Sequence, residues 1–369
     1  MPHATNASVM RDENRKLILN LIRLQPISRV ELAEQTHLTR ASVTQIVDDL
    51  LSAGLVEEKE AVVCSSRGRR RVTLVLKGSG HYVFGVNIGR TNCHVGLMNL
   101  AGEVKTRCTL PVAGLDAAQV LQSISDAIAA MRKNVRGTVL GVGVCTPGPV
   151  DYVSGRVLNP PYFPGWQNVP LCGILSQKTG LKVLLERDTN ARALEEKYFG
   201  SCRDVSNFML LQIHRGVGAG VMIGDKLYRG AGGMGAEIGH TSVCFNGPVC
   251  TCGNRGCLEL YLRPEHLYEG TEYSTWAEAS KDSSVLRRCA EYLAAGLVNA
   301  VNLFDLERIV LSGDLAENSA GLLELLEPMI RQRVLNGQSL REPLLTAGVD
   351  VEPVRTGAMA VLLDFFQKR

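Results

Sequence analysis

The chain has 369 residues, 45% of them apolar, which is enough to bury a sizeable core and to form two or three domains. No apolar run approaches the roughly 20 residues that a helix needs to cross a bilayer, so the sequence excludes a membrane-spanning protein. The net charge of +3 is confined to one end: residues 1–77 carry 12 Lys and Arg against 9 Asp and Glu, and the remaining residues carry 28 of each. A basic excess in one segment favours contact with nucleic acid.

The 11 cysteines are an odd number, and residues 1–14 are polar and lack the apolar segment of a secretory signal. These thiols are therefore expected to stay reduced, as in the cytoplasm, and we expect no membrane insertion. Six cysteines are expected to be small core residues. They are Cys93, Cys108, Cys145, Cys172, Cys202 and Cys289.

Three short helices are predicted at the N-terminal end. Apolar residues recur at helical spacing over 13–24. Ser28 followed by Glu31 is a capping-box signature for a second helix, and Thr39 caps a third helix whose apolar stripe ends at 53–54. A tight turn between the last two helices is typical of a helix-turn-helix. The predicted strands 55–57 and 72–76 flank an arginine-rich loop and would form a wing.

The N-terminal turn of the third helix would enter the major groove. There Arg40 can pair with guanine, Gln45 can pair with adenine, and the small residues allow close approach. The predicted reading residues are Thr39, Arg40, Ala41, Ser42, Thr44 and Gln45. A helical bundle that contacts protein is the alternative.

The predicted wing carries four arginines, interleaved with a glycine, that suit DNA phosphates or a narrow minor groove. They are Arg67, Arg69, Arg70 and Arg71. The alternative is a wing whose charges are merely solvated, as charge runs usually are.

Beyond a linker at 77–80, strands and helices alternate, which predicts an α/β fold of two lobes. We assign residues 1–77 to the winged helix-turn-helix, 78–180 to a first lobe and 181–369 to a second, with the alternative that the C-terminal helix returns to the first lobe. The expected strands are 83–88, 93–99, 103–110, 138–145, 182–186, 207–213 and 219–223. The expected helices are 117–133, 190–198, 284–304, 316–335 and 356–367.

A histidine and three cysteines lie in a glycine-rich stretch, in the order His240, nine residues, Cys250, one residue, Cys252, four residues, Cys257. Tetrahedral zinc takes this ligand set, and four protein ligands leave no position for water, so a structural zinc ion is predicted. Free buried cysteines are one alternative. In another, Cys244 replaces His240 as a ligand.

Several segments together resemble the ROK family of repressors, open reading frames and sugar kinases, over essentially the full length. They are 145–151, 163–166, 186–191, 213–221, 230–240 and 257–259, with the cysteine cluster between the last two. The resemblance implies a two-lobed, actin-like sugar-kinase fold. Family members with a winged helix-turn-helix regulate sugar metabolism, and residues 214–221 are most similar to the glucose and N-acetylglucosamine repressors.

The resemblance also implies a sugar site. In the kinases of the family the aspartate matching Asp188 is the general base, and the residues matching Glu237, His240 and Glu259 bind the sugar. Carboxylates and an imidazole suit ring hydroxyls, and zinc would fix the orientation of the imidazole. Gly148 and Asn190 are assigned to the same pocket.

Departures from the kinase pattern argue against phosphoryl transfer. Asn87 stands where the family has a magnesium-holding Asp, and a neutral amide binds a divalent cation more weakly. His214 and Arg215 add bulk to the second phosphate loop, where backbone must approach phosphate. Since phosphoryl transfer depends on these parts, no kinase activity and no catalytic residue are predicted.

Two further departures concern the ligand. Arg187 replaces a usual Asn beside Asp188, and Tyr162 replaces another. A guanidinium in the cleft suits a phosphate or carboxylate, which favours a sugar phosphate or acidic sugar. The alternative is that Arg187 pairs with Glu186 or Glu195.

The sequence thus predicts a DNA-binding transcriptional regulator of sugar genes, with a double-stranded operator and a sugar or sugar-phosphate effector as its partners. A homodimer or homotetramer on an inverted repeat is expected. The alternatives are a sugar kinase that also binds DNA, and a regulator controlled by a transport-protein partner with a vestigial sugar pocket.

Overall fold

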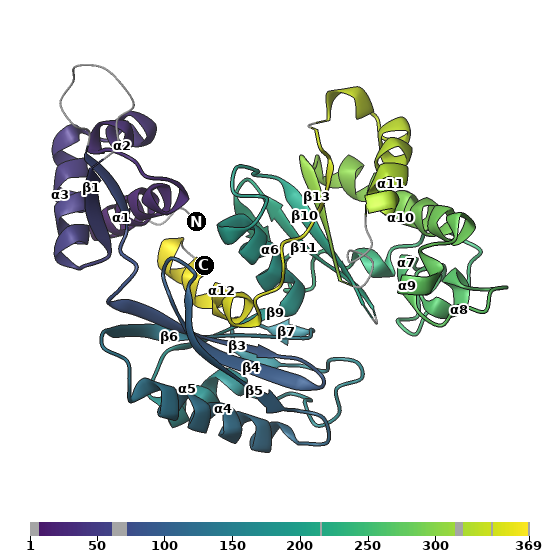
Figure 1. Cartoon of the computed structure of the whole chain (residues 1–369), viewed down its shortest axis with the longest axis horizontal. Helices are drawn as coiled ribbons and strands as arrows, with labels where there is room; N and C mark the ends of the chain where they lie inside the picture. Colours follow the sequence, from purple (N-terminus) through teal and green to yellow (C-terminus); the bar gives the residue numbers. More distant parts are fainter. Residues whose placement is uncertain (1–6, 61–71, 215, 314–319, 341, 368–369) are drawn as a thin grey trace. The chain divides into compact units, whose positions relative to one another are not determined.

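The computed structural model describes residues 7–60, 72–214, 216–313, 320–340 and 342–367 (Figure 1). The chain divides into two compact units. Unit 1 comprises residues 1–188 and 352–369, and unit 2 comprises residues 189–351. Among the helices described, none combines the length and the apolar character required to span a bilayer.

The N-terminal part of unit 1 contains helices α1 (Ala7–Leu24), α2 (Arg29–Thr36) and α3 (Arg40–Ser52), followed by the antiparallel strands β1 (Val56–Glu60) and β2 (Val72–Leu76). The predicted helix-turn-helix with two wing strands is confirmed. Helix α1 begins six residues before its expected start at residue 13. Its first turns show no apolar stripe because they face solvent, and even Val9 and Met10 are exposed there.

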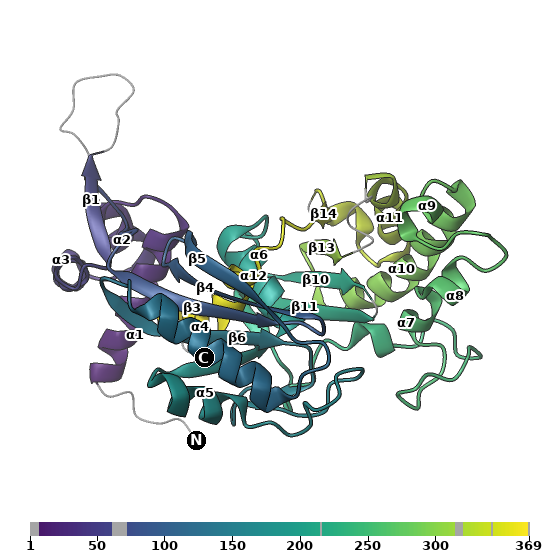
Figure 2. The same ribbon diagram turned by 60° about the horizontal axis from the view of Figure 1, so that its bottom comes forward.

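The rest of unit 1 is built on a five-stranded mixed sheet of order β5-β4-β3-β6-β9. Strands β3, β4 and β5 run antiparallel, whereas β6 and β9 are parallel to β3. Helices α4 and α5 pack on one face and α12 on the opposite face (Figure 1 and Figure 2). The elements are β3 (His81–Ile88), β4 (Asn92–Asn99), β5 (Val104–Pro111), α4 (Ala117–Arg132), β6 (Thr138–Thr146), β7 (Val150–Asp151), β8 (Arg156–Val157), α5 (Leu171–Thr179), β9 (Val183–Arg187) and α12 (Pro353–Phe366).

Helix α12 lies close to this sheet because glycines stand at the contact. A Cβ on Gly85 would come within 1.8 Å of the Val354 carbonyl oxygen, and one on Gly357 within 2.4 Å of the Val86 nitrogen. The C-terminal helix therefore completes the core of unit 1. Strand β9 also belongs to this sheet, whereas the second lobe expected from the sequence begins at residue 181. The Gly180 turn and the following apolar run resemble the start of a new unit, and only the pairing with β6 reveals the strand's place.

Unit 2 repeats the same sheet topology in the order β12-β11-β10-β13-β14, with an antiparallel half and a parallel half. Strands β13 and β14 were not expected from the sequence, because each is a short apolar run beside a long helix. The elements are α6 (Asp188–Phe199, which begins on the last residue of unit 1), β10 (Phe208–Ile213), β11 (Val217–Ile223), β12 (Lys226–Tyr228), η1 (Ile238–His240), α7 (Leu258–Tyr261), α8 (Pro264–Leu267), α9 (Trp276–Ala279), α10 (Ser283–Phe304), β13 (Arg308–Gly313), α11 (Ala320–Arg333), η2 (Gly337–Ser339) and β14 (Leu345–Ala347).

Candidate functional site

Helix α3 presents one face to the core of the N-terminal domain and the other to solvent. Its apolar stripe is buried, and this stripe consists of Val43, Ile46, Val47 and Leu50. All six predicted reading residues, from Thr39 to Gln45, are exposed on the opposite face. The start of the helix is fixed by Thr39, whose Oγ1 accepts a hydrogen bond of 3.2 Å from the Ser42 backbone N–H.

The hydrogen bonds of the exposed residues separate two roles. The hydroxyls of Thr39 and Ser42 lie 2.9 Å apart, and Thr44 Oγ1 donates to the Arg40 carbonyl at 2.9 Å. These three hydroxyls are therefore engaged by the helix itself. The side chains of Arg40 and Gln45 make no hydrogen bond or ion pair with any part of the chain that the structure describes. They are the long polar groups available to a DNA base.

Two arginines brace α3 and neutralise its acidic residues. The Arg29 guanidinium donates to Asp48 of α3 and to Glu58 of β1, both at 2.9 Å, so it ties the third helix to the wing. Arg11 of α1 donates to Asp49 at 2.8 Å. Exposed ion pairs stabilise a fold by little, about 0–1 kcal/mol each, but these two arginines offset the negative charge that would repel DNA phosphates. The partners are 19 to 38 residues apart, so sequence reasoning missed them.

The four wing arginines, from Arg67 to Arg71, lie outside the described residues. The two strands beside them are placed, and Glu60 stands opposite Val72 at the end of the ladder.

The His/Cys cluster of unit 2 brings four possible metal ligands together. One ligand atom from each of His240, Cys250, Cys252 and Cys257 lies within 4.8 Å of all the others. Cys252 Sγ and Cys257 Sγ are 3.7 Å apart, and Cys250 Sγ is 3.7 Å from His240 Nδ1. Around tetrahedral zinc, with bonds of about 2.3 Å to sulfur and 2.0–2.1 Å to nitrogen, these distances would be about 3.8 and 3.6 Å. The donor set and its spacing therefore fit zinc.

Hydrogen bonds of the Asn254 side chain and a tight turn at Gly256 support this geometry. Asn254 Nδ2 donates to the His240 carbonyl at 3.0 Å and to Cys257 Sγ at 3.5 Å, so one amide holds the first and last residues of the cluster together. Gly256 has a φ of +63°, and a Cβ there would lie 1.7 Å from the Cys244 carbonyl oxygen, so no other residue fits. Cys244 itself is exposed and is not part of the four-residue cluster.

The six cysteines expected to be core residues are buried or half-buried. Burial raises the pKa of the Cys202 thiol to about 11, and it also raises the pKa values of Cys93 and Cys289. These thiols stay protonated at neutral pH and are poor nucleophiles, as structural cysteines are.

The candidate effector residues are divided between the two units. Unit 1 holds Gly148, Arg187 and Asp188. Arg187 ends β9 and is 7% exposed, and a Cβ on Gly148 would lie 2.8 Å from its Cδ, so the glycine makes room for this side chain. Thr146 stands opposite Arg187 in the β6–β9 ladder, and its buried Oγ1 has no hydrogen-bond partner among the described residues. Sequence reasoning missed Thr146, which only the strand register reveals.

Unit 2 holds the other four candidates, namely Asn190, Glu237, His240 and Glu259. Glu237 caps η1 and its carbonyl accepts the His240 backbone N–H at 3.0 Å, so both lie on one short turn. Glu259 Oε2 accepts the Val217 backbone N–H at 3.1 Å and Oε1 accepts Arg263 at 2.7 Å. The Glu259 carboxylate is thus held between α7 and β11.

The two loops that depart from the kinase pattern are tight turns. The Gly89 backbone N–H donates to the Asn92 carbonyl at 2.9 Å and closes the β3–β4 turn, while Arg90 donates to the Pro161 carbonyl at 3.2 Å. The His214 N–H donates to the Gly216 carbonyl at 3.1 Å between β10 and β11. Arg215 lies outside the described residues.

A winged helix-turn-helix defines a DNA-binding protein. The two five-stranded sheets that follow it share one topology and form the larger α/β part of the chain. The chain belongs to the ROK family: the family profile matches residues 83–363, and a winged helix-turn-helix DNA-binding profile matches residues 11–57. The resemblance stated from the sequence is therefore confirmed.

Relatives and solved structures agree with this assignment. The chain is 31% identical to the xylose repressor of Caldicellulosiruptor bescii over 97% of each protein. A solved ROK family transcriptional regulator, described as a homolog of the E. coli MLC protein, superposes with a TM-score of 0.82 at 27% identity and 97% coverage of both chains. The ROK hexokinase of Thermus thermophilus gives a TM-score of 0.65 at 28% identity, with 97% of that chain but 76% of this one covered. The likeness to a kinase is thus partial, while the likeness to regulators spans nearly the whole chain.

Proposed function

We propose that this ROK family member is a DNA-binding transcriptional repressor of sugar-uptake or sugar-catabolism genes, acting in the cytoplasm and released from its operator by a sugar or sugar phosphate. The observation that carries this function is the exposed first turn of α3, in a chain whose similarity to a named repressor covers 97% of its length. Arg40 and Gln45 would read base edges, while Thr39 and Ser42 keep the helix end in place for phosphate contact.

The effector contacts are assigned to each unit separately. In unit 1, the buried Arg187 guanidinium would pair with a phosphate or carboxylate, and the Thr146 hydroxyl beside it in the ladder would hydrogen-bond an oxygen of the same group. Asp188 of unit 1 would bind a ring hydroxyl, as would Asn190 and Glu237 of unit 2. The two carboxylate oxygens of Glu259 already accept hydrogen bonds from Val217 and Arg263. Glu259 would therefore contribute chiefly by fixing the start of β11.

A structural zinc ion would be held by His240, Cys250, Cys252 and Cys257. When bound, zinc supplies a cross-link between η1, the following loop and α7. Because His240 and Glu237 share one turn, this cross-link would also fix the Glu237 carboxylate for the effector.

Two α3 helices are needed to read an inverted repeat, so the active form is proposed to be a homodimer or homotetramer. An effector can shift the DNA-binding equilibrium only by the difference between its affinities for the DNA-binding and the DNA-released conformation. Control by a transport-protein partner is the competing mode of regulation.

The central prediction concerns DNA release. Purified full-length protein should bind a fragment from upstream of a sugar-catabolism gene, and one member of a panel of pentoses, hexoses, amino sugars and their phosphates should weaken that binding about tenfold or more. Fluorescence anisotropy measures both effects. A protein that ignores every genomic fragment at low salt would contradict the function, while DNA binding unmoved by the whole panel would favour the protein partner.

A second prediction separates this function from that of a sugar kinase that also binds DNA. Because Asn87 lacks a carboxylate for magnesium and His214 adds a bulky side chain to the second phosphate loop, ATP should not be consumed with any hexose. A coupled assay for ADP, with a ROK hexokinase as the positive control, measures this. Hexose-dependent turnover above the no-sugar background would restore the kinase interpretation.

A third prediction concerns the wing. Replacing Arg67, Arg69, Arg70 and Arg71 with Gln should weaken binding to operator and to unrelated DNA alike, since phosphate contacts carry no sequence information. The slope of log affinity against log salt should flatten by about 0.9 for each phosphate that an arginine no longer neutralises. An unchanged slope would mean that the wing is merely solvated.

A further inference from the structure

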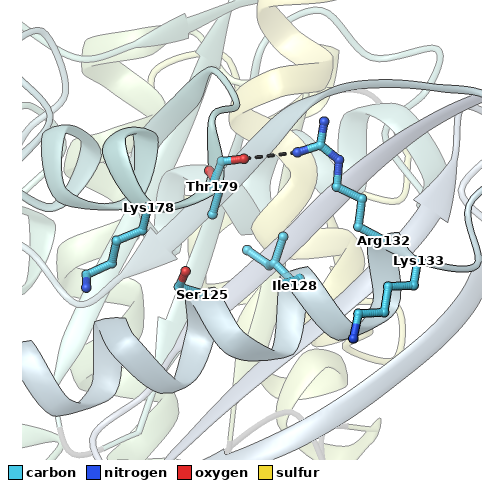
Figure 3. Close-up of a pocket in the computed structure, with 7 residues that line it drawn as sticks. Ser125, Ile128, Arg132, Lys133, Lys178 and Thr179 are labelled. Carbon is cyan, nitrogen blue, oxygen red and sulfur yellow. Dashed lines mark hydrogen bonds between the residues drawn. The ribbon is translucent and has the colours of Figure 1, made fainter.

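A pocket of about 270 Å³ opens between α4 and α5 of unit 1, and none of its lining residues is a candidate effector or DNA-reading residue (Figure 3). Both helices cover the face of the sheet opposite α12 (Figure 1). The residues labelled in Figure 3 line it, namely Ser125, Ile128, Arg132, Lys133, Lys178 and Thr179.

The rim of this pocket carries three cations and no carboxylate. No ion pair joins Arg132, Lys133 or Lys178 to an acidic residue in the part of the chain that the structure describes. Arg132 gives one N–H to the Thr179 carbonyl at 3.0 Å, and the Lys178 ammonium donates to the neutral amide of Gln122. The C-terminal ends of α4 and α5 lie nearby, and the helix dipole gives each about half a negative charge. Together they offset about one of the three positive charges. Gln122 in turn donates to the Asp126 carboxylate at 2.9 Å, but Asp126 does not line the pocket, so the lining itself keeps a net positive charge.

Ser125 adds to the pocket a hydroxyl that has no partner in the described chain. The residue is 8% exposed, and its side chain makes no hydrogen bond within the described residues. Its neighbour Ser123 instead donates to the Gln119 carbonyl at 3.1 Å, as helical serines commonly do. Figure 3 shows the Ser125 hydroxyl on the side of α4 that faces α5. The hydroxyl oxygen is not among the buried atoms without a partner, so it is open to the pocket and can donate to a ligand oxygen.

We propose that the pocket binds the phosphate group of a small anion, with the three cations neutralising its charge and Ser125 donating its hydroxyl. The volume corresponds to about nine water molecules at ~30 Å³ each, which is room for a phosphate with a short carbon chain but less than drug-sized ligands need. The buried Ile128 side chain provides an apolar floor for such a chain. This site shares no residue with the effector candidates, so it would be a second, separate binding site for a phosphorylated molecule.

Isothermal titration calorimetry on the full-length protein tests this with inorganic phosphate, glycerol 3-phosphate and glycerol. We expect glycerol 3-phosphate to bind and glycerol to give no heat. The K133Q/K178Q double variant should bind at least about tenfold more weakly, because it removes two charge-assisted hydrogen bonds to the phosphate. The matched control is K226Q, which removes one exposed cation of unit 2 and should leave the affinity unchanged.

A second variant keeps the test independent of charge. S125A removes a hydroxyl that has no partner among the described residues, so it should leave the melting temperature unchanged. It should weaken the binding of glycerol 3-phosphate, the phosphate ester, by several-fold. Tighter binding of the ester than of inorganic phosphate would identify an organic phosphate as the ligand, and equal binding would identify phosphate itself. The proposal is overturned if neither phosphate nor glycerol 3-phosphate binds at millimolar concentration. It is also overturned if the pocket variants leave the affinity unchanged, or if K226Q reduces it equally.

Discussion

Replacing Cys257 with Ala is expected to lower the zinc content from the proposed one ion per chain to well below half, and to lower the melting temperature by roughly 10 °C. Cys257 Sγ contacts both Cys252 Sγ and the His240 carbonyl, so removal of the thiol opens the cluster at its centre. Structural zinc binds small domains with a free energy of about 10–16 kcal/mol. Each kcal/mol of lost stability lowers Tm by about 2–4 °C, so the loss of only ~3–5 kcal/mol gives a shift of this size. Elemental analysis and calorimetry measure the two effects.

The matched control is Cys244→Ala. Cys244 lies in the same loop but is exposed and outside the four-residue cluster, so this variant should keep its zinc. Full zinc content in the Cys257→Ala protein, or zinc loss in the control alone, would show that the ligands have been assigned wrongly. Zinc loss in both variants would support the alternative in which Cys244 replaces His240, because Cys257 is a ligand in that set as well.

The DNA-binding end could be predicted from the sequence because its signals are local. Ser28 and Glu31 satisfy each other's backbone in a capping box, three positions apart, and Thr39 caps α3 through Ser42. The apolar stripe of α3 repeats at helical spacing, so its exposed face followed from the sequence alone. The metal cluster was equally accessible, since its four residues span only 18 positions.

The remaining features depend on contacts between distant segments. Nothing near Arg29 indicates that it meets Asp48 and Glu58, and nothing near Val183 shows that β9 pairs with β6 rather than starting the second lobe. Thr146 became a candidate because the β6–β9 register places it opposite Arg187. Pairing register is a property of two strands together, and one sequence window does not contain it.

The Arg40→Ala substitution is expected to weaken operator binding by about 5- to 150-fold, corresponding to ~1–3 kcal/mol for removal of a bidentate hydrogen bond to a base. It should weaken binding to unrelated DNA much less, so the ratio of specific to nonspecific affinity falls. Competition titrations with operator and random duplexes measure that ratio, and base substitutions across the operator should show relaxed preference at one guanine. Arg333→Ala, an exposed arginine of unit 2, is the matched control and should leave the ratio unchanged.

The stability of the same variant makes the result interpretable. Arg40 is the first residue of α3 and its side chain has no polar partner in the described chain, and a cation in the first turn of a helix opposes the helix dipole. Its removal should therefore leave the melting temperature unchanged or slightly raised, so weaker DNA binding cannot be ascribed to unfolding. Equal reduction of affinity for operator and random DNA would instead make Arg40 a phosphate contact, and base reading by α3 would then rest on Gln45.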